Sequence, residues 1–280
     1  MLVNMNEVLY PAKEGKYGVG LFNAVNLELA RGIIEAAEET KSPVIFGTAE
    51  VLFPYGPLQA ISNMLLDMAE LASVPVVLHL DHGLKKETCL EALNLGFSSI
   101  MYDCSTDPYE ENIKKTAEMA AIAHDYGATI EAELGHVGNN EGTDVQADPS
   151  AFYTDPAQAK DFVERTGVDA LAIAVGTAHG AYKLPPKLDF ERIETIAATI
   201  DVPLVLHGGS GLTDEDFRHA IASGISKVNI FTDINAAAAK AAVQAYQPGM
   251  GLTDLVLPGI AAVKEATMKK MQLFGCCGKA

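Results

Sequence analysis

Short apolar runs alternate with longer amphipathic segments along the whole chain. The apolar runs are rich in Val, Ile, Leu and Phe and are bounded by Pro, Gly or polar residues, which is typical of buried parallel strands. The strands predicted in this way are 17–22, 43–47, 75–80, 97–103, 129–134, 170–176, 203–207 and 227–231. Helical spacing between them predicts helices over 27–40, 58–72, 87–95, 110–126, 157–166, 190–198, 214–223 and 234–246, with a further helix beginning at 258.

This alternation decides the fold class. Strands that alternate with helices form a parallel sheet, and eight such units with no linker between them favour one closed barrel. The 280 residues slightly exceed the ~250 typical of that fold. We therefore predict an α/β protein, a (β/α)8 TIM barrel in which residues 1–280 form a single domain.

Composition excludes several classes of partner. The 20 Lys and Arg residues face 37 Asp and Glu, a net charge of −17, and this charge repels nucleic acid and anionic membranes. No apolar run approaches the ~18 residues that a membrane span needs, and the first residues do not have the pattern of a signal peptide. Four cysteines follow no recognisable metal or disulfide spacing. We expect a cytoplasmic protein that binds neither nucleic acid nor membrane.

Ionisable and polar residues stand at the C-terminal ends of most predicted strands. The third strand ends in the sequence H-L-D-H-G, the sixth is followed by A-H-G and the seventh by L-H-G-G-S-G. In a (β/α)8 barrel these ends meet on one rim, and that rim carries the active site. Three imidazoles on three strands, with carboxylates between them, are hard to explain as packing.

We interpret His82, His179 and His207 as the ligands of one zinc ion. Zinc accepts imidazole nitrogen, and a catalytic zinc site keeps three protein ligands and one open position. Each of the three precedes a glycine, which leaves room for a ligand. His79 shares a strand face with the aspartate that follows it by two residues, so support of a ligand fits it better than ligation.

Carboxylates beside the imidazoles have two interpretations each. Asp81 suits a general acid/base outside the metal's ligand set, and the alternative is a carboxylate that orients an imidazole. Asp103 and Glu133 are either alternative metal ligands or partners of the ligands. Barrels with zinc-hydrolase activity usually carry His-x-His on their first strand, and this chain does not.

A glycine-rich turn after the seventh strand offers a phosphate site. The segment 207–211, H-G-G-S-G, leads into the helix predicted at 214, and backbone N–H groups at such a turn and helix start can hold a phosphate. Asn229 and Thr232 follow the eighth strand and can add hydrogen bonds to the same ligand. A metal, a base and a phosphate cradle together indicate a phosphorylated carbonyl substrate.

The motifs that carry this chemistry resemble the zinc-dependent class II aldolases of the fructose- and tagatose-bisphosphate type over essentially the whole chain. They are G-L-F-N at 20–23, H-L-D-H-G at 79–83, E-A-E-L-G-H-V-G at 131–138, V-G-T-A-H-G-A-Y at 175–182, V-L-H-G-G-S-G at 205–211 and V-N-I-F-T-D at 228–233. The ending L-F-G-C-C-G-K-A is also similar to a common tail in that family.

The resemblance implies roles for individual residues. It implies Zn2+ on His82, His179 and His207, Asp81 as the acid/base, and Glu141 as a second residue that handles protons. For the phosphate of dihydroxyacetone phosphate, with a sodium or potassium ion, it implies a pocket that we assign to Asn23, Gly180, Gly208, Ser210, Asn229 and Thr232. Homodimers or tetramers are common in the family, so we expect a homo-oligomer and a small phosphosugar substrate.

Departures from the family pattern concern the far end of the substrate. Phe231 and Asn235 stand where family members often have Asp and Arg, or Ala and Lys, and the loop after the second strand brings Glu50 and no cation. Asn139 and Asn140 replace a Gly-Gly pair. We therefore predict cleavage of a ketose 1-phosphate similar to fructose 1,6-bisphosphate, with tagatose 1,6-bisphosphate or a ketose with a sulfonate or neutral C6 group as alternatives.

Two readings from other functional classes stay open at this point. A metal-dependent barrel hydrolase would use metal-bound water as its nucleophile and would release no dihydroxyacetone phosphate. A sugar-phosphate sensor would keep the pocket without turnover, and the presence of Asp81 argues against it.

Overall fold

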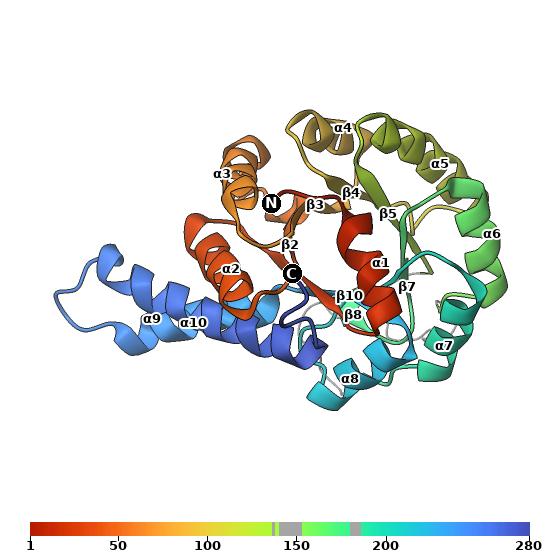
Figure 1. Cartoon of the computed structure of the whole chain (residues 1–280). Helices are drawn as coiled ribbons and strands as arrows, with labels where there is room; N and C mark the ends of the chain where they lie inside the picture. The colour runs from red at the N-terminus through yellow and green to blue at the C-terminus, as the bar shows by residue number, and fades with distance from the viewer. Residues whose placement is uncertain (136–137, 140–152, 180–185) are drawn as a thin grey trace.

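Eight parallel strands close into a barrel in the computed structural model of the chain, which describes residues 1–135, 138–139, 153–179 and 186–280 (Figure 1). At 138–139 and 178–179 only the backbone is described. The ring runs β1, β2, β3, β4, β5, β7, β9, β10 and back to β1. Its strands are β1 Val19–Asn23, β2 Val44–Ala49, β3 Val76–Gly83, β4 Ser99–Tyr102, β5 Thr129–Leu134, β7 Ala170–Ile173, β9 Leu204–Leu206 and β10 Ile225–Ile230. The predicted (β/α)8 fold is confirmed.

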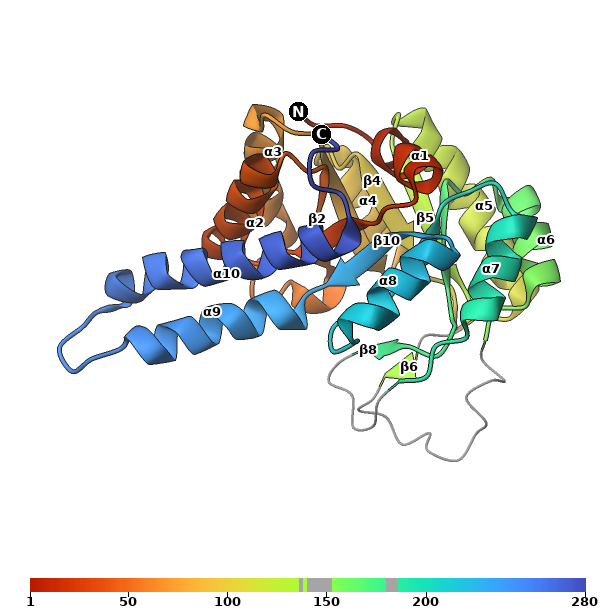
Figure 2. The same ribbon diagram turned by 60° about the horizontal axis from the view of Figure 1, so that its bottom comes forward.

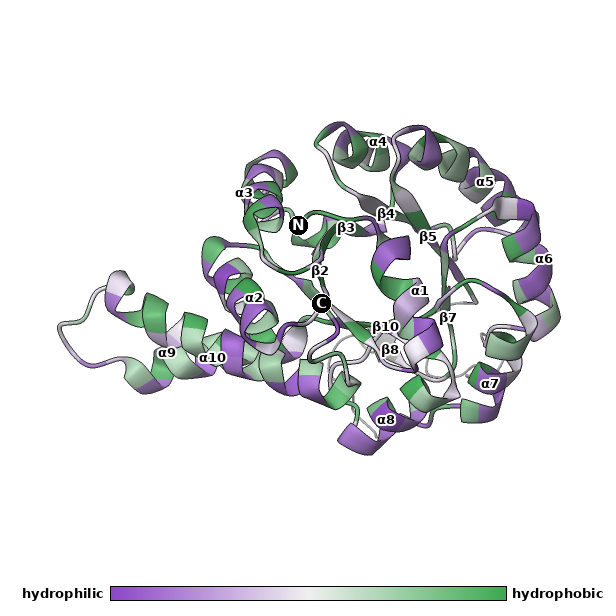
Figure 3. Ribbon diagram, viewed as in Figure 1, coloured by the Kyte–Doolittle hydropathy of each residue, from purple (hydrophilic) through white to green (hydrophobic). Residues whose placement is uncertain are grey.

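Helices surround the barrel and turn their apolar sides inward, as the hydropathy colouring shows (Figure 3). Helix α2 spans Leu27–Thr40, α3 Leu58–Leu71, α4 Lys86–Asn94, α5 Tyr109–Asp125, α6 Pro156–Thr166, α7 Phe190–Thr199 and α8 Asp214–Ser223, and a short 3-10 turn, η1, covers Glu50–Leu52. Most predicted helix boundaries agree with the structure within two residues, because the buried face of each helix determines the spacing of its apolar residues. Strand β3 continues three residues beyond its prediction, as far as Gly83.

The N-terminal mouth of the barrel is covered by α1, Met5–Gly15, which the sequence analysis did not predict (Figure 1). The side chains that this helix buries are Met5, Val8, Leu9 and Ala12. A capping box fixes its start, because the Asn4 side chain accepts from the Glu7 backbone N–H and the Glu7 carboxylate accepts from the Asn4 N–H. That Asn-x-x-Glu spacing was the available signal for this helix.

Two long helices leave the barrel as an antiparallel arm (Figure 2). Helix α9 spans Thr232–Ala245 and α10 spans Leu252–Phe274. The predicted start of the last helix, at Pro258, is wrong by six residues, since α10 begins before its proline and contains it. None of the helices in the described part of the chain is both long and apolar enough to span a membrane.

A small parallel pair of strands extends the C-terminal side of the barrel (Figure 2). Strand β6, Gly138–Asn139, pairs with β8, Ala178–His179, so that the backbone of Asn139 lies opposite that of His179. The segments after β5 and β7 are thereby joined at the rim where the polar strand ends meet.

Candidate active site

The end of β3 presents two neighbouring side chains, Asp81 and His82, to the same rim. Consecutive residues of a regular strand point to opposite faces. Here the register with β4 shifts between Leu80 and Gly83, and His82 has a left-handed backbone with φ of 43°. Such a conformation is strained for any residue but glycine and is found at functional sites. The irregularity re-aims His82, whose Nε2 comes within 3.9 Å of Asp81 Oδ1.

Asp81 is held by two amides from neighbouring parts of the barrel. Asn23 Nδ2 donates to its Oδ2 at 2.8 Å, and Asn229 Nδ2 donates to its Oδ1 at 2.9 Å. Gly47 makes this possible, because a Cβ at that position would lie 2.4 Å from Asn23 Oδ1. Burial tends to raise the pKa of Asp81, but His82 and then Lys227 outweigh burial and lower the pKa to about 2. Asp81 is therefore a fixed, charged proton acceptor at neutral pH.

His82 and His207 meet edge to face, with ring centroids 4.6 Å apart. Asp103 Oδ2 lies 2.8 Å from His82 Nδ1. Glu131 Oε1 lies 2.9 Å from His207 Nε2, and Glu133 Oε2 lies 3.1 Å from His207 Nδ1 on the other side of the ring. Burial lowers the pKa of His207, but the hydrogen bonds to both glutamates raise it to about 10. Carboxylates thus fix the orientation of both rings.

These donors fit a metal cation. Ligand atoms of Asp81, His82 and His207 lie within 4.8 Å of one another, and so do those of His82, Asp103 and Glu133. The carboxylates of Asp81, Glu131 and Glu133 are buried together here, so a bound dication would offset part of their negative charge. Imidazole and carboxylate groups are ligands that zinc accepts in proteins, and here each is oriented by a further carboxylate or amide.

Three predicted site residues lie wholly or partly outside this description. The structure places the backbone of His179 in β8 but describes nothing of its side chain, and Gly180 and Glu141 lie outside the described residues. Their assignments stay predictions. His82 and His207 are brought together as predicted, and Asp103 and Glu133 lie next to them rather than elsewhere on the rim.

The phosphate cradle differs in one respect from its prediction. Helix α8 is already capped by its own residues, since Thr213 Oγ1 accepts from the Asp216 N–H and the Asp216 carboxylate accepts from the Thr213 N–H. Because backbone N–H groups at this helix start already have partners within the chain, they offer a phosphate fewer hydrogen bonds than the sequence analysis expected. The start of α9 suits an anion better, because its cap residue, Phe231, makes no side-chain hydrogen bond there.

A comparison of the whole chain with protein families agrees with this chemistry. Residues 3–279 match the family model described as fructose-bisphosphate aldolase class-II. The chain belongs to this family. The fructose-bisphosphate aldolase of Geobacillus stearothermophilus is 42% identical over 285 residues, which cover 100% of this chain and 99% of that protein. A probable fructose-bisphosphate aldolase of Bacillus subtilis is also 42% identical, over 289 residues, with the same coverage.

Solved structures of two proteins named as aldolases share the fold. The YdjI aldolase of Escherichia coli K12 superimposes with a TM-score of 0.91 at 39% identity, and the match covers 100% of both chains. A putative fructose-1,6-biphosphate aldolase of Coccidioides immitis gives a TM-score of 0.89 at 31% identity, covering 99% of this chain and 97% of that one.

Two further residues of this cluster were not predicted from the sequence. Lys227 is buried in the barrel beside Glu131, at 2.7 Å between Nζ and Oε2. Asn112, from α5, donates to the Glu133 backbone carbonyl at 3.1 Å. The signal for Lys227 was its position two residues before Asn229, because a period of two places both on one strand face. Nothing local in the sequence marks Asn112.

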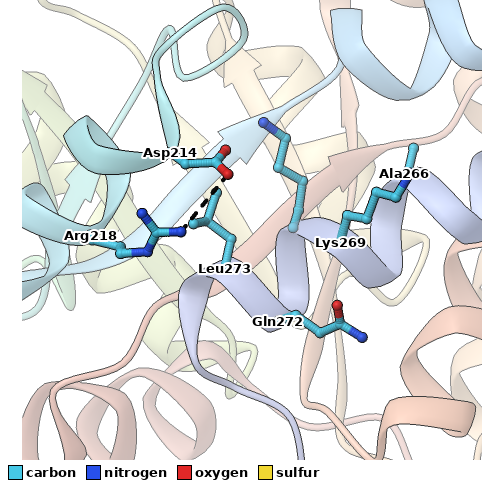
Figure 4. Close-up of a pocket in the computed structure, with 7 residues that line it drawn as sticks. Asp214, Arg218, Ala266, Lys269, Gln272 and Leu273 are labelled. Atoms are coloured by element: carbon cyan, nitrogen blue, oxygen red, sulfur yellow. Dashed lines mark ion pairs between the residues drawn. The ribbon is translucent and has the colours of Figure 1, made fainter.

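A groove lies outside the barrel between α8 and α10 (Figure 4), and it is less suitable than the rim as a phosphosugar site. Its charged residues include Asp214, Arg218 and Lys269. Arg218 pairs with Asp214 at 3.8 Å, and Lys269 pairs with Glu265 at 2.7 Å. These charges neutralise one another, and the groove shares no residue with the cluster around His82 and His207.

Proposed function

We propose that this class II family member is a zinc-dependent aldolase that reversibly cleaves a ketose 1-phosphate, similar to fructose 1,6-bisphosphate, into dihydroxyacetone phosphate and an aldehyde such as glyceraldehyde 3-phosphate. One observation carries the proposal: Asp81, charged and held by two amides, lies beside the donor cluster of His82 and His207. A proton acceptor next to a Lewis-acid site is what a retro-aldol step requires.

Zinc would be held by His82, His179 and His207, and when bound it would supply Lewis-acid polarisation of the substrate carbonyl. Asp81 accepts the proton of the C4 hydroxyl while the C3–C4 bond breaks and C4 becomes the aldehyde carbon. The electron pair of that bond stays on the three-carbon fragment, which becomes dihydroxyacetone phosphate when C3 is protonated. We assign that last proton transfer to Glu141.

The phosphate is proposed to lie between the turn at Gly208 and Ser210 and the start of α9 at Thr232. Gly208 has a φ of 66°, a conformation that favours glycine and lets successive backbone N–H groups point into the turn. Asn23 and Asn229 would face the substrate from the Asp81 side. A sodium or potassium ion at the phosphate belongs to the same proposal.

Release of dihydroxyacetone phosphate is the direct test. The zinc-loaded protein is incubated with fructose 1,6-bisphosphate, and glycerol-phosphate dehydrogenase reports the product. We expect a kcat/KM of about 10^4 M⁻¹s⁻¹ or more for the physiological ketose. Phosphate release without dihydroxyacetone phosphate would favour a hydrolase instead, and ligand binding without any product would favour a sensor.

A ketose whose C6 group is not a phosphate is a second candidate, favoured by the loop after β2. Glu50 Oε1 pairs with Lys85 Nζ at 3.1 Å, and Glu50 Oε2 accepts from the Leu84 N–H at 3.0 Å. Lys85 is therefore paired with Glu50, and its charge is partly neutralised for a second phosphate at this loop. A panel of ketose 1-phosphates with phosphate, sulfonate or neutral C6 groups, including tagatose 1,6-bisphosphate, would rank the candidates by kcat/KM.

The arm supports the proposal of a homo-oligomer, dimer or tetramer. Val243, Leu252 and Leu257 are 77%, 79% and 64% exposed, and Asp254 is the one charged residue between positions 241 and 263. Copies that each carry −17 would meet most easily where charge is sparse. Light scattering should give a mass above that of one chain, and Leu252→Glu should lower it.

We further propose that residues 1–280 act as one domain in the cytoplasm.

A further inference from the structure

A fully buried ion pair lies one layer below the proposed zinc ligands. Lys227 on β10 and Glu131 on β5 have no exposed side-chain surface. Each precedes a rim residue on its own strand, Asn229 or Glu133, by two positions, so it points into the barrel one layer nearer the N-terminal end. A lysine is almost never buried to this extent without a partner, and here the partner is Glu131.

The two oxygens of Glu131 have separate partners. Oε2 lies 2.7 Å from Lys227 Nζ, while Oε1 lies 2.9 Å from His207 Nε2. His79 Nε2 is 3.9 Å from the same Oε2, and His79 Nδ1 is 2.8 Å from Ser99 Oγ. Lys227 therefore fixes the carboxylate from below, and the carboxylate fixes the imidazole from the side.

We propose that Lys227 is a positioning residue for the metal: it anchors Glu131 so that the His207 Nε2–H donates to Oε1 and Nδ1 becomes the nitrogen that binds zinc. Partners that orient a metal-binding histidine set its tautomer and contribute strongly to metal affinity. The proposal rests on the zinc site of the proposed function. Its readout is zinc binding without substrate, so an inactive protein that binds zinc would contradict the aldolase and not this inference.

Two other roles for a lysine inside a barrel fit the geometry less well. An imine-forming lysine needs an amine that a substrate can reach, and Lys227 Nζ is held by Glu131 and has no exposed surface. A lysine that only neutralises buried charge would not need to share a carboxylate with a proposed metal ligand. The experiment separates this second role from positioning.

The first measurement compares single variants. Lys227→Met keeps the length of the side chain and removes the ammonium group. On metal-stripped protein, competition with a chelating dye gives the apparent Kd for Zn2+, and we expect it to rise 10–100-fold. Ser99→Ala is the matched control, because Ser99 is also fully buried in the barrel and contacts His79 rather than Glu131. An increase below tenfold in Lys227→Met, or an equal one in the control, would overturn the proposal.

The double variant Lys227→Met with Glu131→Gln separates anchoring from charge neutralisation. It removes both charges and keeps an oxygen that can accept from His207, so we expect thermal stability to recover. Zinc affinity should stay at least tenfold below that of the wild type, because the amide has no anchor. Full recovery of zinc affinity would overturn the proposal, because it would mean that Lys227 only neutralises the charge of Glu131. This variant also decides the question if Lys227→Met alone does not fold.

A measurement on the zinc-loaded wild type needs no variant. Long-range 15N–1H spectra distinguish the two imidazole nitrogens, and His207 should carry its proton on Nε2 with zinc on Nδ1. Zinc on Nε2 would overturn the proposal, since Glu131 could not then hold that nitrogen.

In steady-state assays, loss of the anchor in Lys227→Met should lower kcat and leave KM nearly unchanged, because the ketose does not touch Lys227.

Discussion

The two ends of the barrel are built from different chemistry. At the N-terminal mouth, α1 packs apolar side chains such as Leu9 over the strands, and Thr129 Oγ1 accepts from the Met5 backbone N–H. At the C-terminal rim, carboxylates, amides and imidazoles are crowded together, and His82 has a strained backbone. The apolar end stabilises the fold, whereas the crowded charges and the strained backbone at the rim lower the free energy of unfolding.

The ends are joined by a column of buried polar groups. Ser99 donates to Met5 Sδ of α1 at 3.9 Å and contacts His79, which approaches Glu131 beneath His207. A substitution at either end therefore tests whether stability and chemistry are separable along this axis.

Removal of His207 should have the largest effect, and only at the rim. His207→Ala deletes a proposed zinc ligand and leaves Glu131 and Glu133 without the ring between them. We expect zinc content, measured by elemental analysis, to fall from about one ion per chain to near zero, and turnover to fall with it. His124→Ala is the matched control, because His124 is an exposed imidazole that pairs with Asp169. Full zinc occupancy in His207→Ala would show that the ligand set is misassigned.

Removal of Asp81 should separate proton transfer from metal binding. Asp81→Ala should keep its zinc and lower kcat by ~10^2–10^4, the usual scale of general acid–base assistance. At the opposite end, Asp169 accepts from the Ile130 N–H and from Asn6, so Asp169→Ala should lower stability and leave kcat unchanged. Equal turnover of Asp81→Ala and wild type would exclude the proposed role.

Truncation at the N-terminal mouth should affect stability alone. Leu9 is 1% exposed in α1, and Leu9→Ala should lower the free energy of unfolding by about 2–5 kcal/mol through lost burial and a cavity. Leu84→Ala, at an exposed position of the rim, is the matched substitution and should cost little. Chemical denaturation measures both. A fall in kcat of the folded Leu9→Ala enzyme would mean that the mouth and the rim are coupled through the polar column.

The same division explains what the sequence could predict. Strand and helix positions follow from apolar spacing, and the rim residues follow from their place at strand ends, so the barrel and the meeting of His82 with His207 were accessible. Helix α1 was missed because its apolar stripe is short and interrupted by polar residues and Pro11.

Contacts across the barrel were not accessible in the same way. Whether Glu131 faces Lys227 or another residue depends on strand order and stagger, which a single sequence does not contain. The self-capping of α8 was overlooked although its Thr-x-x-Asp spacing is local. The strand-end positions and the family motifs predicted the same ligand set, but only the register shift at Leu80–Gly83 explains how the neighbouring residues Asp81 and His82 reach one site.

The smallest effect is a pH dependence that distinguishes the metal-free rim from the loaded one. Without a metal on His207, the pKa of this imidazole is raised from 6.5 to about 10, since its two glutamates outweigh burial. A raised pKa stabilises the fold fully below about pH 6.5, and that stabilisation is lost gradually as the pH rises toward 10. The melting temperature of chelator-treated protein should therefore fall across this window.

Zinc should remove that fall, because a metal on His207 takes the place of the proton and binds better as the pH rises. The comparison is made by thermal unfolding between pH 6.5 and 9 with excess chelator or excess Zn2+. Leu9→Ala, altered only at the other end, should keep the wild-type slope at a lower melting temperature. Parallel slopes for the metal-free and zinc-loaded proteins would mean that His207 does not exchange a proton for the metal.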